Sequence, residues 1–140
     1  MKKIGFTGTQ KGMTYKQGET LLALLSRGEV GEFHHGDCKG ADAQAHEIAR
    51  ACRIPIYIHP PLIPEKRAYK HSRFTYPPEM YSERNRNIVD ACNILIACPS
   101  SRSEEARSGT WATIHYARKK NKEIKIIWPD GKIKEEERKC

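Results

Sequence analysis

Hydrophobic residues along this chain fall into two alternating patterns. Short, nearly continuous apolar runs are typical of strands that are buried on both faces. Between these runs, segment 15–27 carries leucines at helical spacing, and segment 41–53 carries a face of small residues. The pattern predicts strands at 3–7, 32–36, 56–58, 93–98 and 124–128. It predicts helices at 15–27, 41–53, 82–92 and 109–120.

This alternation predicts the architecture of the chain. Strands that alternate with helices form a parallel sheet whose two faces are both covered by helices. We therefore expect an α/β fold: a single Rossmann-like, doubly wound, mostly parallel five-stranded sheet with helices on both faces. The sequence shows no internal repeat and no boundary between domains, so residues 1–140 are expected to form one domain.

Two segments interrupt the alternation. Segment 60–80 is rich in proline and carries Tyr69, Phe74 and Tyr76 among basic residues. It leaves the third predicted strand at its carboxyl end, the edge where open α/β sheets bind ligands. We interpret it as a lid-like, partly mobile loop rather than a plain linker. The last segment, 130–140, is expected to be a charged tail.

Charge and cysteine content narrow the class of protein. The chain has 25 Lys and Arg against 17 Asp and Glu, a net charge of +8. No apolar run reaches the roughly 18 residues that span a bilayer, and the first residues lack the pattern of a signal peptide. We therefore expect a cytoplasmic protein without a membrane partner. The five cysteines are odd in number and lack CxxC spacing, so they support neither a disulfide framework nor a zinc site.

Three polar turns that each join a predicted strand to a helix indicate a binding site. Glycine turns and helix N-termini present backbone N–H groups that suit an anion. Two arginines begin helix 82–92, where positive charge opposes the helix dipole, and this favours a role in pairing with phosphate. Because parallel strands end at one edge of a sheet, these groups should share one pocket. The predicted ligand-binding residues are Thr7, Gly8, Thr9, Gly36, Asp37, Gly40, Asp42, Arg84, Asn85, Arg86, Ser108, Gly109 and Thr110.

Several of these residues have a second interpretation. Asp37 precedes a helix and could cap it instead of contacting a ligand. Asp42 and His46 are spaced i,i+4, which suits either a pair in the pocket or a buried structural pair. No third ligand joins them, so no metal site is predicted. The sequence assigns no catalytic residue and no cofactor.

Three motifs in order carry a resemblance to a known family. They are Gly-Ala-Asp-Ala-Gln-Ala-His at 40–46, Arg-Asn-Arg at 84–86, and Ser-Gly-Thr at 108–110 followed by Thr113 and Ala117. Together they resemble the SLOG superfamily of Rossmann-like proteins, which includes the DNA-processing protein DprA/Smf and the LOG phosphoribohydrolases. The resemblance implies a strand order close to 3-2-1-4-5, a nucleotide pocket at the carboxyl ends of the strands, and frequent homo-oligomers.

The sequence departs from the family where catalysis is concerned. LOG enzymes carry a Pro-Gly-Gly-x-Gly-Thr-x-x-Glu turn whose glutamate is essential for N-glycosidic cleavage. Here Thr113 stands where that glutamate would fall, and threonine cannot act as a carboxylate base. DprA proteins are longer and have further domains. The resemblance therefore favours a nucleotide-binding core over an enzyme.

These observations lead to one expected function and two alternatives. We expect a protein that binds a small phosphorylated nucleotide-derived ligand, of the ADP-ribose type or a cyclic nucleotide, as a homo-oligomer. By family analogy it would be a sensor or a sequestering sponge in nucleotide-signalling defence or counter-defence. One alternative is a nucleotide N-glycosidase or phosphoribohydrolase that uses Glu83, Glu105 or Asp42 as a displaced carboxylate. The other is DprA-like binding of single-stranded DNA, helped by segment 60–80.

Overall fold

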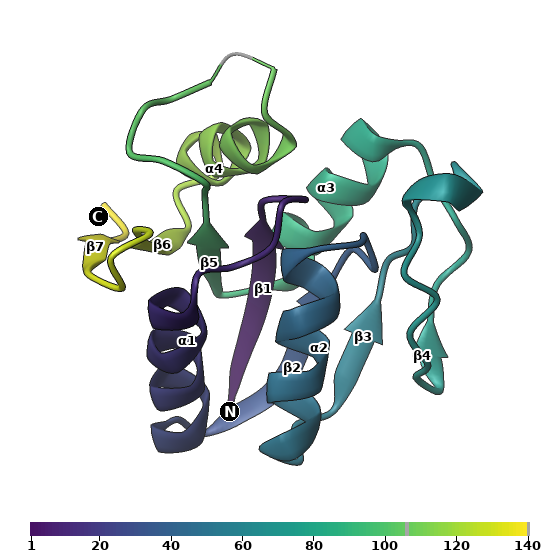
Figure 1. Cartoon of the computed structure of the whole chain (residues 1–140), viewed down its shortest axis with the longest axis horizontal. Coiled ribbons are helices and arrows are strands. Elements are labelled where there is room, and N and C mark those ends of the chain that lie inside the picture. The colour runs from purple at the N-terminus through teal and green to yellow at the C-terminus, as the bar shows by residue number, and fades with distance from the viewer. Residues whose placement is uncertain (106, 140) are drawn as a thin grey trace.

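The computed structural model describes residues 1–105 and 107–139 of the chain. Within these ranges one sheet contains seven strands in the order β4-β3-β2-β1-β5-β6-β7 (Figure 1). The strands are β1 (Lys2–Gly8), β2 (Val30–His35), β3 (Ile56–Ile58), β4 (Phe74–Thr75), β5 (Ile94–Cys98), β6 (Glu123–Ile127) and β7 (Ile133–Glu136). Neighbouring strands run parallel, apart from the antiparallel pair of β6 and β7.

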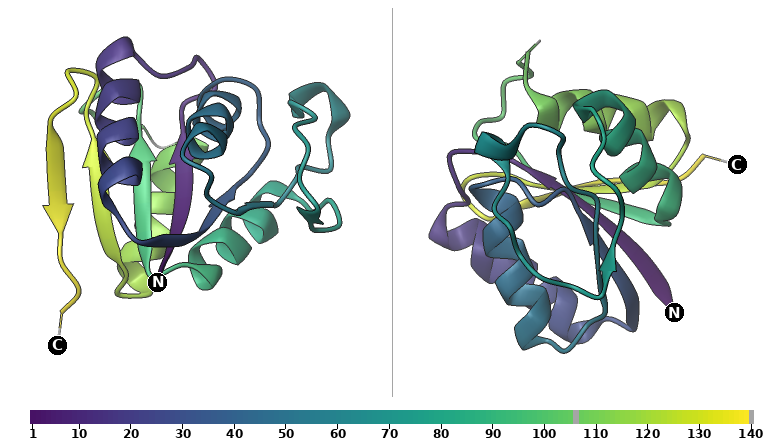
Figure 2. Two further views of the ribbon diagram at one scale, coloured as in Figure 1. Left: turned by 90° about the horizontal axis from the view of Figure 1, so that it is seen from below. Right: turned by 90° about the vertical axis from the view of Figure 1, so that its right-hand side faces the viewer.

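Helices cover both faces of the sheet. The first pair, α1 (Tyr15–Arg27) and α2 (Ala41–Ala51), lies on one face, and α3 (Tyr81–Ala91) and α4 (Gly109–Lys119) lie on the other, as Figure 2 shows from the side. A short 3-10 helix, η1 (Pro64–Lys66), interrupts the connection from β3 to β4. Among the described helices, none combines the length and the apolar composition that crossing a membrane requires. The expected α/β, Rossmann-like and mostly parallel architecture is confirmed.

The expected number of five strands is wrong, because the sheet carries an additional strand at each edge. Segment 60–80 contributes β4, whose start is fixed by Ser72: its hydroxyl donates to the carbonyl of Ile56 and accepts from the N–H of Phe74. Segment 130–140, expected as a tail, contributes β7, which ion pairs such as Lys125–Glu135 join to β6. Both strands are short and contain no more than one apolar residue, so they lack the apolar runs that mark the five central strands.

Small residues and glycine bring α2 close to the end of β1. The alanines at positions 41, 45 and 49 are fully buried and form the face that α2 turns to the sheet. A Cβ atom added at Gly8 would lie only 2.5 Å from the Cβ of Ala41. Only glycine permits this approach, which places the N-terminus of α2 beside the carboxyl end of β1.

The order of the strands creates a switch point between β1 and β5. From β1 the chain proceeds through β2, β3 and β4 on one side, then returns to β5 on the other side of β1. Gly8 and Cys98, the last residues of β1 and β5, are register partners. Open α/β sheets bind ligands outside the carboxyl ends of the strands at such a point.

Candidate functional site

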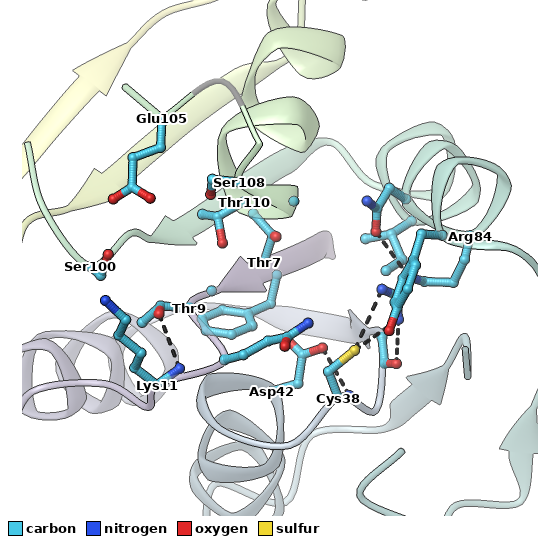
Figure 3. A pocket seen from close by; sticks show the side chains of 18 of the residues that line it. Thr7, Thr9, Lys11, Cys38, Asp42, Arg84, Ser100, Glu105, Ser108 and Thr110 are labelled. Atoms are coloured by element: carbon cyan, nitrogen blue, oxygen red, sulfur yellow. Dashed lines mark hydrogen bonds between the residues drawn. The ribbon is translucent and has the colours of Figure 1, made fainter. Parts of the chain in front are cut away.

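A cavity of about 640 Å³ lies at this switch point. Figure 3 shows Asp42 and Cys38 on one side of it, Ser108 and Thr110 across from them, and Arg84 and Lys11 at the two ends. The residues that line the cavity are Phe6, Thr7, Gly8, Thr9, Gln10, Lys11, Gly36, Cys38, Asp42, Tyr81, Arg84, Asn85, Ile88, Ser100, Glu105, Arg107, Ser108, Gly109 and Thr110.

The turn after β1 forms the floor of the cavity and is held in place by its backbone. The N–H of Thr9 donates to the carbonyl of Cys98, and the carbonyl of Thr9 accepts from the N–H of Ala41. The hydroxyl of Thr9 accepts from the N–H of Lys11 at 3.1 Å. The floor is therefore tied to both β5 and α2, while the side chain of Lys11 remains exposed at the rim.

The turn after β2 contains two aspartates with different roles. Asp37 has a positive φ of 53° and is fully buried. Its carboxylate accepts from the side chain of Arg67 at 3.1 Å and from the N–H of Lys70 at 2.9 Å. Asp37 therefore fastens segment 60–80 to the turn and does not line the cavity. In the structure Asp37 does not cap α2, whose N-cap is Gly40. A contact between Asp37 and a ligand stays a prediction.

Asp42, in the first turn of α2, lines the cavity and is 7% exposed. Its carboxylate accepts from the backbone N–H groups of Cys38, at 3.2 Å, and Gly36. Burial raises the pKa of Asp42 to about 6, although the positive charge of Arg84 and these two backbone donors oppose that rise. The cavity therefore contains a carboxyl group whose pKa lies close to neutral pH.

Arg84 is buried at 6% exposure and supports the wall of the cavity. Its guanidinium donates to the carbonyl of Gly36 at 2.5 Å and to the side-chain oxygen of Asn85 at 2.9 Å. Its longer contacts reach the Cys38 sulfur and the ring of Tyr81. One of these two acceptors lies in the turn after β2 and the other lies on α3. The guanidinium therefore holds this turn against α3.

The N-terminus of α4 forms the opposite wall. Ser108 caps this helix: its hydroxyl accepts from the N–H of Trp111 at 3.3 Å. Within residues 1–105 and 107–139, the N–H groups of Gly109 and Thr110 have no hydrogen-bond partner. No acidic residue occupies the first turn of α4. An anion at this position would therefore meet the positive end of the helix dipole and N–H groups that have no acceptor in the described part of the chain.

The structure brings most of the predicted site residues to the cavity and leaves three away from it. Those that line it are Thr7, Gly8, Thr9, Gly36, Asp42, Arg84, Asn85, Ser108, Gly109 and Thr110. Asp37, Gly40 and Arg86 do not. Arg86 is exposed on α3, two residues after buried Arg84. At Gly40, with φ of 94°, a Cβ would lie 2.3 Å from the carbonyl oxygen of Gln10, so this glycine permits a close backbone contact.

Sequence reasoning missed Ser100 and Arg107 in the loop between β5 and α4, and it named Glu105 of this loop only as a possible displaced carboxylate. Ser100, Glu105 and Arg107 line the cavity from this loop. Their position after the strand end at Cys98 is the signal that could have identified them. No residue of segment 60–80 lines the cavity in the part of the chain that the structure describes. A lid over the ligand from that segment therefore stays a prediction.

Four buried histidines form two hydrogen-bonded pairs under the turn after β2, which the sequence did not predict. The N–H of Asp37 donates to Nδ1 of His35, so His35 carries its proton on Nε2 and donates to Nδ1 of His46 at 2.9 Å. His46 therefore does not pair with Asp42. His34 contacts His59 at 2.8 Å. Burial lowers the pKa of all four histidines, that of His59 to about 3.

The described residues can also be searched for groups of metal-ligating side chains and for carboxylates at the cavity. Within residues 1–105 and 107–139, no group of three or more His, Cys, Asp or Glu side chains could hold a metal ion. Thr113 is buried, and its hydroxyl donates to the carbonyl of Gly109 at 2.8 Å inside α4. The carboxylates that do line the cavity are Asp42 and Glu105.

Comparison with known proteins identifies the fold. No sequence profile of a protein family and no curated protein matches the chain. Among solved structures it is similar to the X-ray structure of DNA processing protein A (DprA) from Streptococcus pneumoniae, with a TM-score of 0.67 and 18% sequence identity. The match covers 89% of this chain and 49% of that one, so this chain spans about half the length of that protein. The likeness shows a DprA-like, Rossmann-like fold.

Proposed function

We propose that the cavity binds a small phosphorylated nucleotide-derived ligand, with the phosphate at the N-terminus of α4. The observation that carries the proposal is the uncompensated start of this helix. The N–H groups of Gly109 and Thr110, which have no acceptor among the described residues, lie beside the hydroxyls of Ser108 and Thr110, and the cations Lys11 and Arg107 stand at the same cavity. Backbone donors, hydroxyl groups and positive charge together suit a phosphate.

The position and the size of the cavity agree with this ligand class. It lies at the switch point between β1 and β5, where open α/β sheets bind nucleotides. Its volume of about 640 Å³ falls in the range of small-molecule sites. The lining alternates polar turns with apolar Phe6 and Ile88, so a ligand with both a phosphate and a less polar ring would find partners for both.

The proposed role is binding without turnover, as a sensor or a sequestering sponge for a signalling nucleotide. Thr113 supports it, since a hydroxyl that is buried and bonded within α4 cannot replace a catalytic carboxylate. Membership of the SLOG superfamily and assembly into a homo-oligomer are part of the same proposal.

Calorimetry with AMP, ADP-ribose, cyclic AMP and inorganic phosphate tests the proposal. At least one nucleotide should bind, and phosphate should compete with it. Arg107→Ala should weaken binding about fivefold, the effect of one partly exposed charge on a phosphate. Lys119→Ala removes a matched charge from the far end of α4 and should leave the affinity unchanged. Equal losses for the two variants would contradict placement of the phosphate at the N-terminus of α4.

Chromatography of the same mixtures tests turnover. We expect each nucleotide to be recovered intact after prolonged incubation. Loss of a nucleotide in excess over the protein would instead support the N-glycosidase alternative. Asp42 and Glu105 would then be its candidate carboxylates, because Glu83 is exposed on α3 and does not line the cavity.

A second candidate function, binding of single-stranded nucleic acid, is favoured by the surface of segment 60–80. Tyr69 and Tyr76 are 54% and 45% exposed. The guanidinium of Arg67 lies 4.7 Å from the centre of the Tyr69 ring, and that of Arg73 lies 4.8 Å from the Phe74 ring. Exposed rings beside cations suit stacked bases and phosphates, and the solved structure with a similar fold is a DNA processing protein. Affinity for an oligonucleotide that falls steeply with salt would support this candidate.

A further inference from the structure

The carboxylate of Asp42 has acceptor capacity that the protein does not use. An ionised carboxylate offers about four acceptor sites. Within the described chain, the donors that reach Asp42 are the backbone N–H groups of Cys38 and Gly36, both on the side of the turn after β2. The remaining acceptor positions belong to a side chain that lines the cavity and lies opposite Ser108 and Thr110 (Figure 3).

The charged groups around Asp42 leave this capacity open. Arg84, from α3, is the nearby cation, but its guanidinium donates to Gly36 and Asn85 and forms no ion pair with Asp42 within 4 Å in the described residues. Asp37 in the turn adds negative charge, and the thiols of Cys38 and Cys98 flank the carboxylate from the turn and from β5. Arg84 therefore lowers the pKa of Asp42 through its charge but forms no ion pair with it in the described residues, and the free acceptor positions of Asp42 remain available.

A carboxylate that has no ion-pair partner among the described residues orients a phosphorylated ligand. It repels phosphate, so the phosphate is directed to the opposite wall at α4. The group that approaches Asp42 must instead donate hydrogen bonds. In a nucleotide, the nearest donors to the phosphate are the hydroxyls of the ribose, and a carboxylate can accept from two neighbouring hydroxyls at once.

We propose that Asp42 determines the specificity of the cavity by accepting hydrogen bonds from free ribose hydroxyls, so that the site selects ribonucleotides over their deoxy forms. This inference rests on the proposed function, since it requires a phosphate at α4. It adds that the wall opposite α4 recognises the ribose of the ligand. A ligand without these hydroxyls leaves a buried acceptor unpaired, which is costly.

The test compares AMP with 2′,3′-dideoxy-AMP on the unmodified protein by calorimetry. We expect AMP to bind at least tenfold more tightly. The ratio of the two affinities should shrink as the pH falls from 8 to 5, because Asp42 loses its charge near pH 6. The second ionisation of phosphate also lies near pH 6, but it affects both ligands equally and cancels in the ratio.

Variants separate this inference from the proposed function. Asp42→Asn keeps an acceptor for Cys38 but removes the charge, and it should reduce the AMP preference to less than threefold while phosphate still binds. Glu47→Gln removes a charge from the exposed surface of the same helix and should preserve the preference. Equal binding of both ligands to the unmodified protein would overturn the role of Asp42 and leave the proposed function standing. Absence of binding by AMP and by phosphate would overturn both.

Discussion

Two helix N-termini meet at the same cavity, and they differ in how their charge is balanced. The first turn of α2 carries its own carboxylate, Asp42, and the N–H of Ala41 is bonded to Thr9. The first turn of α4 carries no acidic residue, and its cap is the neutral Ser108. Each helix dipole favours negative charge at this end. At α2 the protein supplies that charge, whereas at α4 a bound anion would have to supply it.

The glycines at the two ends differ in the same way. Gly40 has a positive φ and lies against the backbone of Gln10. At Gly109, no atom of the described residues lies within 4 Å of where a Cβ would be. One end is thus closed by tight backbone contacts and the other is open. The comparison suggests that a polar turn alone does not identify a ligand site, because what fills the space in front of the turn decides it.

The largest expected effect comes from exchanging these glycines for alanine. Gly40→Ala places a Cβ in a left-handed conformation and 2.3 Å from a backbone oxygen, and it should lower the free energy of unfolding by roughly 3 kcal/mol or more. Gly109→Ala meets no atom of the described residues and should change stability by less than about 0.5 kcal/mol. Urea unfolding of both variants measures the difference. Similar losses for the two variants would contradict the contrast between a closed and an open end.

The central elements could be predicted from the sequence because each of them is defined by local periodicity. All five residues of β5 are apolar and buried, and α2 shows its alanine face. β4 and β7 could not be predicted in this way. β4 has two residues in a proline-rich segment, and β7 carries Glu135, whose ion-pair partner Lys125 lies on β6. Pairing of a polar edge strand depends on long-range contacts that no local pattern records.

The candidate site could be predicted only to the level of the turn. Strand ends converge by topology, and in the structure residues of the turns after β1, β2 and β5 line one cavity. Within a turn, however, one dihedral angle decides where a side chain points. Asp37 has a φ of 53° and faces Arg67, while Asp42 faces the cavity. The rotation of α3 about its own axis likewise buries Arg84 and leaves Arg86 exposed. The spacing of the residues along the sequence predicts neither the difference between the two aspartates nor that between the two arginines.

Lowering the pH should reduce the stability of the folded protein through the two histidine pairs under the turn after β2. The pKa of each buried histidine is lowered in the folded state, so unfolding takes up protons below the ordinary value of 6.5. This contribution to stability is present above pH 6.5 and is lost as the pH falls toward the folded values, about 3 for His59. Asp42 acts in the opposite direction, because its raised pKa favours folding as the pH falls through about 6.

The histidines outnumber this single carboxylate, so we expect a net loss of roughly 2 kcal/mol in unfolding free energy between pH 7.5 and 5.5. Urea titrations at the two pH values measure it. His46→Gln should reduce the pH dependence, because glutamine takes up no proton on unfolding. A stability that is flat over this range would mean that the buried histidines are already charged in the folded protein.

The smallest expected effect concerns the cap of α4, and it separates helix stability from ligand binding. Ser108→Ala removes the acceptor for the N–H of Trp111 and should cost about 1 kcal/mol of stability, as is usual for an N-cap. Thr14→Ala removes the corresponding cap of α1, where Thr14 accepts from Gln17, and should cost a similar amount. Thr14 does not line the cavity. If phosphate binds at α4, only Ser108→Ala should also weaken AMP, by roughly five- to tenfold, since it removes a hydroxyl beside the phosphate. Equal affinity for AMP in the two variants, measured by calorimetry at matched folded fractions, would show that the open end of α4 is not where the anion binds.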